Sequence, residues 1–162
     1  MVSKILTTHV GSLPRSKQLS EYLFAKDKGE KIDNNNFENV LISNVDQIVK
    51  RQLEVGIDFI SDGEMSKISY ATYIKDRIDG FSGESERRAP ADLDDFPEYK
   101  EKIANSGGTP TYSRPCCTKE LKIKDENLLL NDINNFNKSL NKFNHTKAFM
   151  NAASPGVINV FM

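Results

Sequence analysis

Apolar positions recur at helical spacing in the first third of the chain, and the longest such stretch predicts a helix that begins near Asn36. Its core-facing stripe consists of Phe37, Leu41, Val45, Ile48 and Gln52, widened by Val40 and Val49. Gly56 stands where a glycine in the left-handed conformation commonly ends a helix. Short β-type runs at 5–10 and 57–62 flank this helix, and the order strand, helix, strand predicts a parallel sheet.

Shorter patterns predict further helices. Apolar residues keep helical spacing at 19–24 and again at 70–78, where Gly80 closes the second of these helices. A spacing that alternates between four and three residues over 129–143 predicts a helix that faces the core, with Asp125 as its N-cap. The chain is therefore expected to be a mixed α/β protein.

The remaining stretches are less regular. Residues 82–110 lose all periodicity, which predicts a long irregular insertion. The run 111–124 partly alternates, as in a half-exposed hairpin or edge segment, and 147–153 predicts a short buried strand. The chain then ends in the apolar run 157–162. Because domain termini are usually polar and poorly packed, we expect that further chain completes the core.

Charge and cysteine content narrow the class of partner. The sequence has 22 Lys and Arg against 23 Asp and Glu, a net charge of −1, which gives no reason to expect nucleic acid or an anionic membrane. No apolar run approaches the roughly 20 residues that span a bilayer, and the sequence opens without a signal-peptide pattern. Cys116 and Cys117 are adjacent, which favours a reducing compartment over a disulfide framework. We expect a cytoplasmic protein that binds small molecules.

Residues 7–15 are the first candidate for chemistry, because a predicted strand breaks there at Gly11. Glycine lets the backbone approach a ligand, and the amides around Ser12, together with its hydroxyl, can hold a carboxylate. Arg15 can add a fixed positive charge. The alternative is a strand-to-helix turn in which Ser12 or Ser16 caps a helix.

The second candidate is the acidic turn Asp62-Gly63-Glu64, which follows the predicted strand at 57–62. In parallel α/β folds the carboxyl ends of the strands carry the ligand site. Glu64 beside a glycine can accept hydrogen bonds from a ligand ammonium, while Asp62 can orient a neighbouring group. The alternative is that Asp62 caps a helix beginning near Ser66.

A metal site within this chain is not expected. Adjacent residues of a strand point to opposite faces, so one metal ion would rarely take both Cys116 and Cys117. His145 precedes a predicted strand and should lie at the opposite end of the sheet from His9. The spaced Cys/His pattern of zinc sites is absent, and neither thiol has an identified base that would make it a nucleophile.

Several of these residues belong to segments with a familiar pattern: Thr7-Thr8-His9-Val10-Gly11-Ser12-Leu13-Pro14-Arg15, Asp62-Gly63-Glu64, Arg114-Pro115-Cys116 and 149–156. Together they resemble the cobalamin-independent methionine synthase family, above all its short single-barrel members. The resemblance implies a (β/α)8 barrel of the TIM type. A complete barrel of this type needs roughly 250 residues. Residues 1–162 would then form an incomplete N-terminal half barrel of about four strands.

The expected strands of that half barrel are 5–10, 57–62, 111–124 and 147–153. A half barrel leaves unpaired edges and a bare apolar interior, so the chain should fold poorly alone.

The resemblance also implies a reaction. In the family, a zinc-bound homocysteine thiolate attacks the N5-methyl group of a reduced folate, and cobalamin takes no part. Zinc is needed because a free thiol is mostly protonated at neutral pH, and coordination removes that proton. The family's zinc ligands lie in the C-terminal half of the barrel, which these residues do not include. No catalytic or metal-ligating residue is therefore assigned here.

The resemblance assigns substrate contacts residue by residue. Val10, Gly11 and Ser12 match the segment that contacts the amino-acid end of homocysteine in the family, and Gly63 and Glu64 match its Gly-Glu pair. These assignments agree with the carboxylate and ammonium sites inferred from the residues themselves.

His9, Arg15 and Asp62 complete the set of predicted substrate-binding residues. His9 replaces the threonine of the longer members and is typical of the shorter ones. The expected function is the homocysteine subsite of a methyltransferase that uses a methyl-folate. The alternatives are a related zinc-dependent thiol transferase with another methyl or alkyl donor, and a non-catalytic chain that needs a partner such as a complementary C-terminal half.

Overall fold

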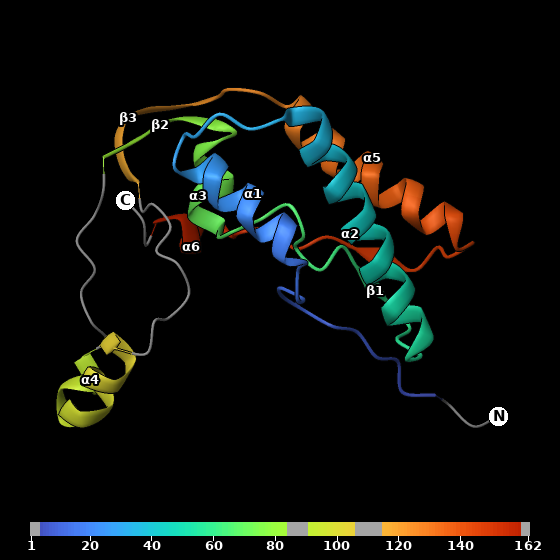
Figure 1. The fold of residues 1–162 in the computed structure, drawn as a ribbon, viewed down its shortest axis with the longest axis horizontal. Helices are drawn as coiled ribbons and strands as arrows, with labels where there is room; N and C mark the ends of the chain where they lie inside the picture. The colour runs from blue at the N-terminus through green and yellow to red at the C-terminus, as the bar shows by residue number, and fades with distance from the viewer. Residues whose placement is uncertain (1–3, 84–90, 106–114, 160–162) are drawn as a thin grey trace.

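The structure is a computed structural model that describes residues 4–83, 91–105 and 115–159. Figure 1 shows its helices and strands along the chain. In order they are α1 (Lys17–Asp27), α2 (Asn34–Glu54), β1 (Ile60–Ser61), α3 (Tyr70–Lys75), β2 (Ile78–Ser82), the 3-10 helix η1 (Ala91–Asp95), α4 (Pro97–Asn105), β3 (Cys116–Ile123), α5 (Asn127–Lys142), β4 (Ala148–Phe149) and α6 (Pro155–Asn159). The expectation of a mixed α/β protein is confirmed.

Three chain segments run parallel to one another. Thr8 forms a parallel bridge with Phe59, directly before β1. β1 pairs in parallel with β4, where Ile60 lies opposite Ala148. The predicted strands at 5–10, 57–62 and 147–153 thus pair as expected, although their regular parts are short. Because the segments are parallel, their carboxyl ends lie at one edge.

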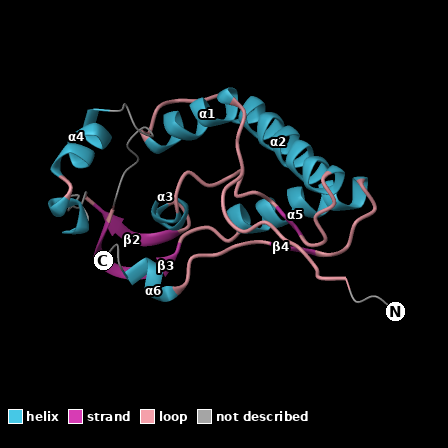
Figure 2. Cartoon of the chain, turned by 90° about the horizontal axis from the view of Figure 1, so that it is seen from below, coloured by secondary structure: helices cyan, strands magenta, loops and turns pink. Residues whose placement is uncertain are grey.

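The predicted barrel is not confirmed, because the described residues form this parallel set and a separate two-stranded sheet. The prediction that 111–124 supplies another strand of the barrel is wrong for its described part. That part, β3, pairs antiparallel with β2. Figure 2 shows this two-stranded sheet at the end of the molecule away from the N-terminus, with α1 and α2 on one side of β4.

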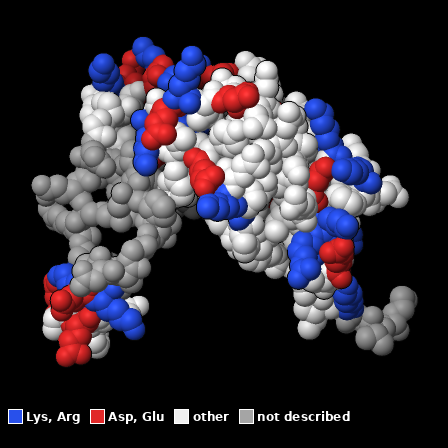
Figure 3. All heavy atoms as spheres, in the orientation of Figure 1, with Lys and Arg blue, Asp and Glu red and all other residues white. Residues whose placement is uncertain are grey.

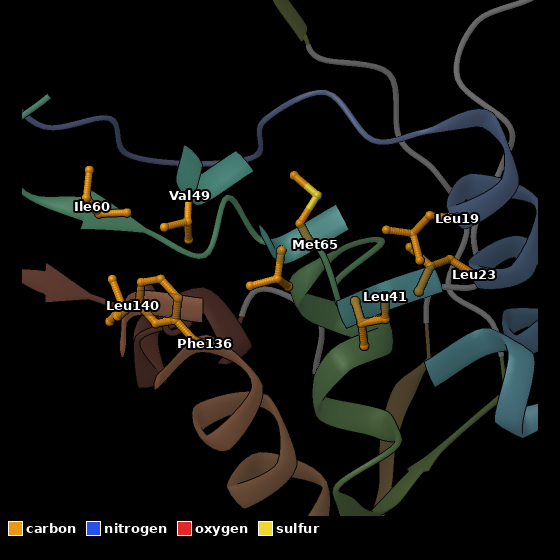
Figure 4. Packing of buried hydrophobic residues seen from close by; sticks show 9 residues of the cluster. Leu19, Leu23, Leu41, Val49, Ile60, Met65, Phe136 and Leu140 are labelled. Atoms are coloured by element: carbon orange, nitrogen blue, oxygen red, sulfur yellow. The ribbon is translucent and has the colours of Figure 1, made fainter. Parts of the chain in front are cut away.

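The core lies where α2 and α5 pack together and cover the parallel segments. α2 begins after Asp33, whose side chain accepts hydrogen bonds from the N–H groups of Asn35 and Asn36. Gly56 follows its end with φ of 81°, as a left-handed glycine should. Figure 4 shows the buried cluster, which consists of Leu19, Leu23, Leu41, Val45, Val49, Ile60, Met65, Phe136 and Leu140. The two long helices predicted from periodicity are confirmed.

Asp125 is not the N-cap of α5, as predicted, because the helix begins one residue later and Glu126 takes that position. The Asp125 side chain nevertheless accepts a hydrogen bond from the Asn127 N–H at 2.8 Å. The prediction therefore found the polar group at the helix start but placed the boundary one residue early.

The helix predicted over 70–78 is too long. α3 ends at Lys75, and Ile78 and Gly80 belong to β2. Gly80 lies within β2 and does not close a helix. A glycine is required there because a Cβ would lie 2.8 Å from the carbonyl oxygen of Glu120 in the paired strand. Pairing with a strand distant in sequence thus overrides a local helical spacing.

The lack of regular structure predicted over 82–110 is wrong for the described central part, and that this stretch is an insertion stays a prediction. Residues 91–105 form η1 and α4, and α4 begins with Pro97, a residue well suited to the first turn of a helix. The predictions for 84–90 and for 106–114, including the Arg114 part of the third familiar segment, lie outside the described residues.

Charges of both signs are intermixed on the face drawn in Figure 3, so this face has no extended patch of one sign. Among the described residues, no helix combines the length and the apolar character that a membrane crossing requires. The mixture of charges agrees with the near-zero net charge of the sequence.

Candidate functional site

Three polar side chains meet at the carboxyl ends of the parallel segments. The Ser12 hydroxyl donates a hydrogen bond to Glu64 Oε2 at 2.5 Å. The Asn151 side-chain amide donates to Glu64 Oε1 at 3.2 Å. Each of these residues follows a different parallel segment, so the pairing of the backbone brings them together. The carboxylate of Glu64 is consequently the centre of the candidate site.

The turn that carries Glu64 has an unusual backbone. Gly63 has φ of 61° and Glu64 has φ of 56°, so two successive residues adopt the left-handed region. Asp62 Oδ1 accepts a hydrogen bond from the Glu64 N–H at 3.2 Å, and the Leu13 N–H donates to the Gly63 carbonyl at 3.0 Å. A non-glycine residue in this conformation is costly, and such strain concentrates at functional sites. The bonds hold Glu64 in place while it is 6% exposed.

Arg15 supports the same turn from the other side. Its Nη2 donates to the Glu64 carbonyl at 2.7 Å and also contacts the Lys67 carbonyl. Burial lowers the pKa of the Arg15 guanidinium, and the nearby Glu64 and Asp62 oppose that effect. The structure thus places Arg15 on the backbone of the turn; its predicted role in substrate binding stays a prediction.

Ser12 does not cap α1, since Ser16 fills that position. The Ser16 side chain accepts from the Leu19 N–H at 3.2 Å. The two serines left open by the sequence are therefore divided between a helix cap and a hydrogen bond to Glu64. This division leaves the Ser12 side chain at the candidate site.

Asp62 and Lys67 form a buried pair next to Glu64. Lys67 is 3% exposed and Asp62 is 4% exposed, and their nearest charged atoms, Nζ and Oδ2, lie 3.9 Å apart. Burial raises the pKa of Asp62, whereas the Lys67 charge lowers it. Asp62 does not cap a helix, because the helix predicted near Ser66 begins only at Tyr70.

The other predicted residues lie on the turn that follows Thr8. Val10 is 67% exposed, His9 is half-buried, and Gly11 has φ of 95°. The His9 Nε2 atom is buried and has no hydrogen-bond partner among the described residues. These positions are adjacent to Ser12 in the chain, and their contacts with a substrate stay predictions.

Sequence reasoning missed two members of the cluster. Asn151 carried one signal, since it lies within the predicted strand 147–153, near the edge where the predicted site should form. Lys67 carried none beyond its place three residues after Glu64. Its place in the cluster follows from its hydrogen bond to the Asn151 carbonyl, which spans 2.6 Å.

The described residues do not fit a zinc ion. No group of at least three His, Cys, Asp or Glu side chains among them has the arrangement that holds a metal. Cys117 Sγ contacts the Lys119 carbonyl at 3.5 Å, and His145 Nε2 contacts the Lys147 carbonyl at 3.0 Å. The expectation that Cys116 and Cys117 share no metal site with the two histidines stays a prediction.

A parallel α/β arrangement with a buried carboxylate at the carboxyl ends of its segments is typical of enzymes and ligand-binding proteins of the α/β class. Residues 5–89 match the family model described as the catalytic domain of cobalamin-independent synthase. The chain belongs to this family of cobalamin-independent methionine synthases. The match includes Ser12, Glu64 and Lys67, and it ends before Asn151.

Curated relatives give the same family. The chain is 27% identical over 75 residues to 5-methyltetrahydropteroyltriglutamate–homocysteine methyltransferase from Bifidobacterium longum subsp. infantis. It is 28% identical over 75 residues to the enzyme of that name from Xylella fastidiosa. Each alignment covers 46% of this chain and 10% of the relative. The chain thus spans about a tenth of the length of these relatives.

Proposed function

We propose that this chain supplies the subsite for the amino-acid end of homocysteine in a methyltransferase that takes its methyl group from a methyl-folate. The observation that carries the proposal is the Glu64 carboxylate, which is 6% exposed and accepts hydrogen bonds from Ser12 and Asn151. The names of the curated relatives include homocysteine and 5-methyltetrahydropteroyltriglutamate, which supports the choice of substrates.

Glu64 would accept hydrogen bonds from the ligand ammonium. Charge-assisted hydrogen bonds are stronger than neutral ones, and a site with little water strengthens them further. The Ser12 hydroxyl and the Asn151 amide fix the orientation of the carboxylate before the ligand arrives. Pre-organisation of this kind raises affinity because the side chain loses less conformational entropy on binding.

The ligand carboxylate would lie against the turn at Val10, Gly11 and Ser12. Positive φ at Gly11 allows the backbone to turn sharply, and a turn of this type presents amide groups to an anion. His9 is adjacent to this turn. In this proposal Arg15 and Asp62 act mainly by holding the turn that carries Glu64.

The thiol of the substrate requires activation that the described residues do not supply. In the family a zinc ion provides it by removing the thiol proton. We expect the zinc ligands outside the described residues, and no step of the present proposal passes through the metal. Cobalamin is not required, in keeping with the family name.

The exposed first segment favours a partner surface along the parallel set, before the Thr8 bridge. Ile5 is 88% exposed and Leu6 is 51% exposed, although both lie beside the parallel set. Exposed apolar residues at the edge of a sheet are a place where another strand can add. We therefore propose that a complementary half chain, which would carry the metal, completes the barrel along this segment.

Calorimetric titration of homocysteine into the full-length native protein tests the proposed subsite. Glu64→Gln keeps the shape of the side chain and removes its charge, and we expect affinity to fall at least about tenfold, or 1.4 kcal/mol. Glu21→Gln, on the exposed face of α1, is the matched control and should leave affinity unchanged. Unchanged affinity in Glu64→Gln would remove Glu64 from the site.

An assay of methionine formation distinguishes the proposed methyl-folate from another methyl or alkyl donor. If the enzyme uses a methyl-folate, adding 5-methyltetrahydropteroyltriglutamate with homocysteine should give methionine. Homocysteine binding that depends on Glu64, without methionine from this donor, would favour the related thiol transferase with another methyl or alkyl donor.

A further inference from the structure

Lys67 links two of the segments that build the site. Its ammonium donates to the Asn151 carbonyl at 2.6 Å, and its own carbonyl accepts from Arg15. The Asn151 side chain in turn donates to Glu64 Oε1 at 3.2 Å. Lys67 therefore connects the turn after β1 with the segment after β4 at the residue whose amide contacts Glu64.

The surroundings of Lys67 leave its ammonium little freedom. The side chain is 3% exposed, with Asp62 Oδ2 at 3.9 Å and the centre of the Tyr73 ring at 5.1 Å. A lysine ammonium has three donors, which suits it to contact a carboxylate, a carbonyl and a ring face together. The hydrogen bond to the Asn151 carbonyl joins the ammonium to the segment after β4.

We propose that Lys67 is a positioning residue for the site: by holding the Asn151 backbone, it keeps the Asn151 amide against Glu64 and so fixes the carboxylate that receives the ligand ammonium. This inference rests on the proposed function. It adds a residue that contacts neither the reacting atoms nor the ligand and acts through its hydrogen bond to the Asn151 carbonyl.

The free-energy cost of burying the Lys67–Asp62 ion pair favours a positioning role for Lys67 over a purely structural one. Removing two charges from water costs several kcal/mol, and an apolar pair of similar volume is often as stable or more stable. The ion pair with Asp62 therefore does not by itself explain why a lysine is buried at position 67. The bond to the Asn151 carbonyl gives the lysine a task that an apolar residue cannot perform.

A double-mutant cycle on homocysteine affinity tests the proposal in the full-length native protein. Lys67→Met removes the ammonium at similar side-chain length, and Asn151→Ala removes the amide but keeps the carbonyl that Lys67 contacts. Each single variant should weaken homocysteine binding about tenfold. The double variant should bind no more weakly than Asn151→Ala, because Lys67 has nothing left to position.

Other outcomes are equally decisive. Additive losses in the double variant would show that Lys67 acts independently of Asn151 and would overturn the proposal. Unchanged affinity in Lys67→Met, with a loss in Glu64→Gln, would also overturn it while leaving the subsite intact. If neither Glu64→Gln nor Asn151→Ala affects affinity, the proposed function itself fails.

Stability has to be separated from positioning. Lys67→Met leaves the Asp62 carboxylate buried without its nearest cation, so the cycle is repeated with Asp62→Asn in every variant. Stability should then recover while homocysteine binding stays weak. Recovery of both would assign Lys67 a structural role. Lys50→Met, at an exposed position of α2, is the matched control and should change neither quantity.

Discussion

The side-chain amide of Gln52 forms hydrogen bonds with both backbone groups of Ser61. Gln52 Nε2 donates to the Ser61 carbonyl at 2.8 Å, and Gln52 Oε1 accepts from the Ser61 N–H at 3.1 Å. Both residues are buried, at 3% and 1% exposure. Gln52 in α2 thus supplies the donor and acceptor that a neighbouring strand would give to the last residue of β1.

Gln52→Leu should destabilise the protein more than the same substitution at an exposed glutamine. The leucine leaves the N–H and the carbonyl of Ser61 buried without these partners, and each such group costs about 1–3 kcal/mol. We expect the free energy of unfolding to fall by about 2–4 kcal/mol in urea denaturation. Gln47→Leu, on the exposed side of the same helix, should change it by less than about 0.5 kcal/mol.

The same substitution should disturb the site, because Ser61 immediately precedes the turn that carries Glu64. Homocysteine affinity should fall in Gln52→Leu even at temperatures where the variant is folded. A folded variant with native affinity would show that the turn is held without the Gln52 amide.

Asp58 binds the first parallel segment through Lys4 and Thr7, and its pKa should lie well below that of an ordinary aspartate. Its carboxylate accepts from the Thr7 N–H at 2.9 Å and contacts the Lys4 ammonium. The Lys4 hydrogen bond and then the Thr7 N–H lower the pKa of Asp58 to about 2. Since the folded pKa is depressed, the stabilisation is complete above the ordinary value near 3.8 and is lost as pH falls through about 2.

Proton NMR of the Thr7 amide measures this titration directly. Its chemical shift should change with a midpoint near pH 2, and Asp58→Asn should abolish the change. A midpoint at the ordinary aspartate value would mean that the Lys4 and Thr7 contacts do not persist in solution.

Sequence periodicity predicted the parts of this fold that depend on neighbouring residues. The stripe around Val45 gave α2 because burial of one helix face is repeated along the segment itself. Ser12 was selected because a predicted strand breaks at Gly11, and Glu64 because parallel strands carry ligands at their carboxyl ends. Their hydrogen bond agrees with that rule.

The features that sequence reasoning missed depend on partners far along the chain. Ile78 continues a helical spacing, and only its pairing with Ile123 places it in a strand. Lys67 and Asn151 are 84 residues apart, so neither indicates the other in the sequence. α4 is a different case: Pro97 at its first position was a local signal that the loss of apolar periodicity concealed.

Tyr73 should remain protonated at pH values where exposed tyrosines ionise. Its hydroxyl donates to Asp132 Oδ2 at 2.9 Å, and the Arg77 guanidinium lies 3.4 Å from its ring centre. Burial raises the pKa of Tyr73 far above the usual 10, with a smaller contribution from the Asp132 charge. Because the unfolded chain ionises first, stability should fall as pH rises past about 10.

Tyr73→Phe should remove part of this pH dependence and cost about 1 kcal/mol at neutral pH through the lost hydrogen bond. The ultraviolet titration of tyrosinate in the folded protein should be the same with and without Tyr73. Tyr99→Phe, at a position 55% exposed on α4, is the matched control and should leave the stability at neutral pH unchanged. Loss of a titrating group in Tyr73→Phe would contradict the assigned burial.

Gly63 should tolerate no side chain, for two separable reasons. Its φ of 61° disfavours any L-residue, and a Cβ would lie 3.0 Å from Met65 Cε, 3.1 Å from Leu13 Cβ and 3.2 Å from Ile48 Cγ1. Gly56→Ala isolates the first reason, since Gly56 has φ of 81° and open space around its Cα. We expect that control to lose about 1–2 kcal/mol of unfolding free energy.

Gly63→Ala should lose this conformational cost and about 1–3 kcal/mol more, because the packed neighbours have to move. The displacement acts on the turn that carries Glu64, so homocysteine affinity should fall in Gly63→Ala and remain native in Gly56→Ala. Urea denaturation and calorimetric titration of the two variants measure both effects. Equal stability losses would mean that the packing around Gly63 yields without cost, and the turn would then be less rigid than its hydrogen bonds indicate.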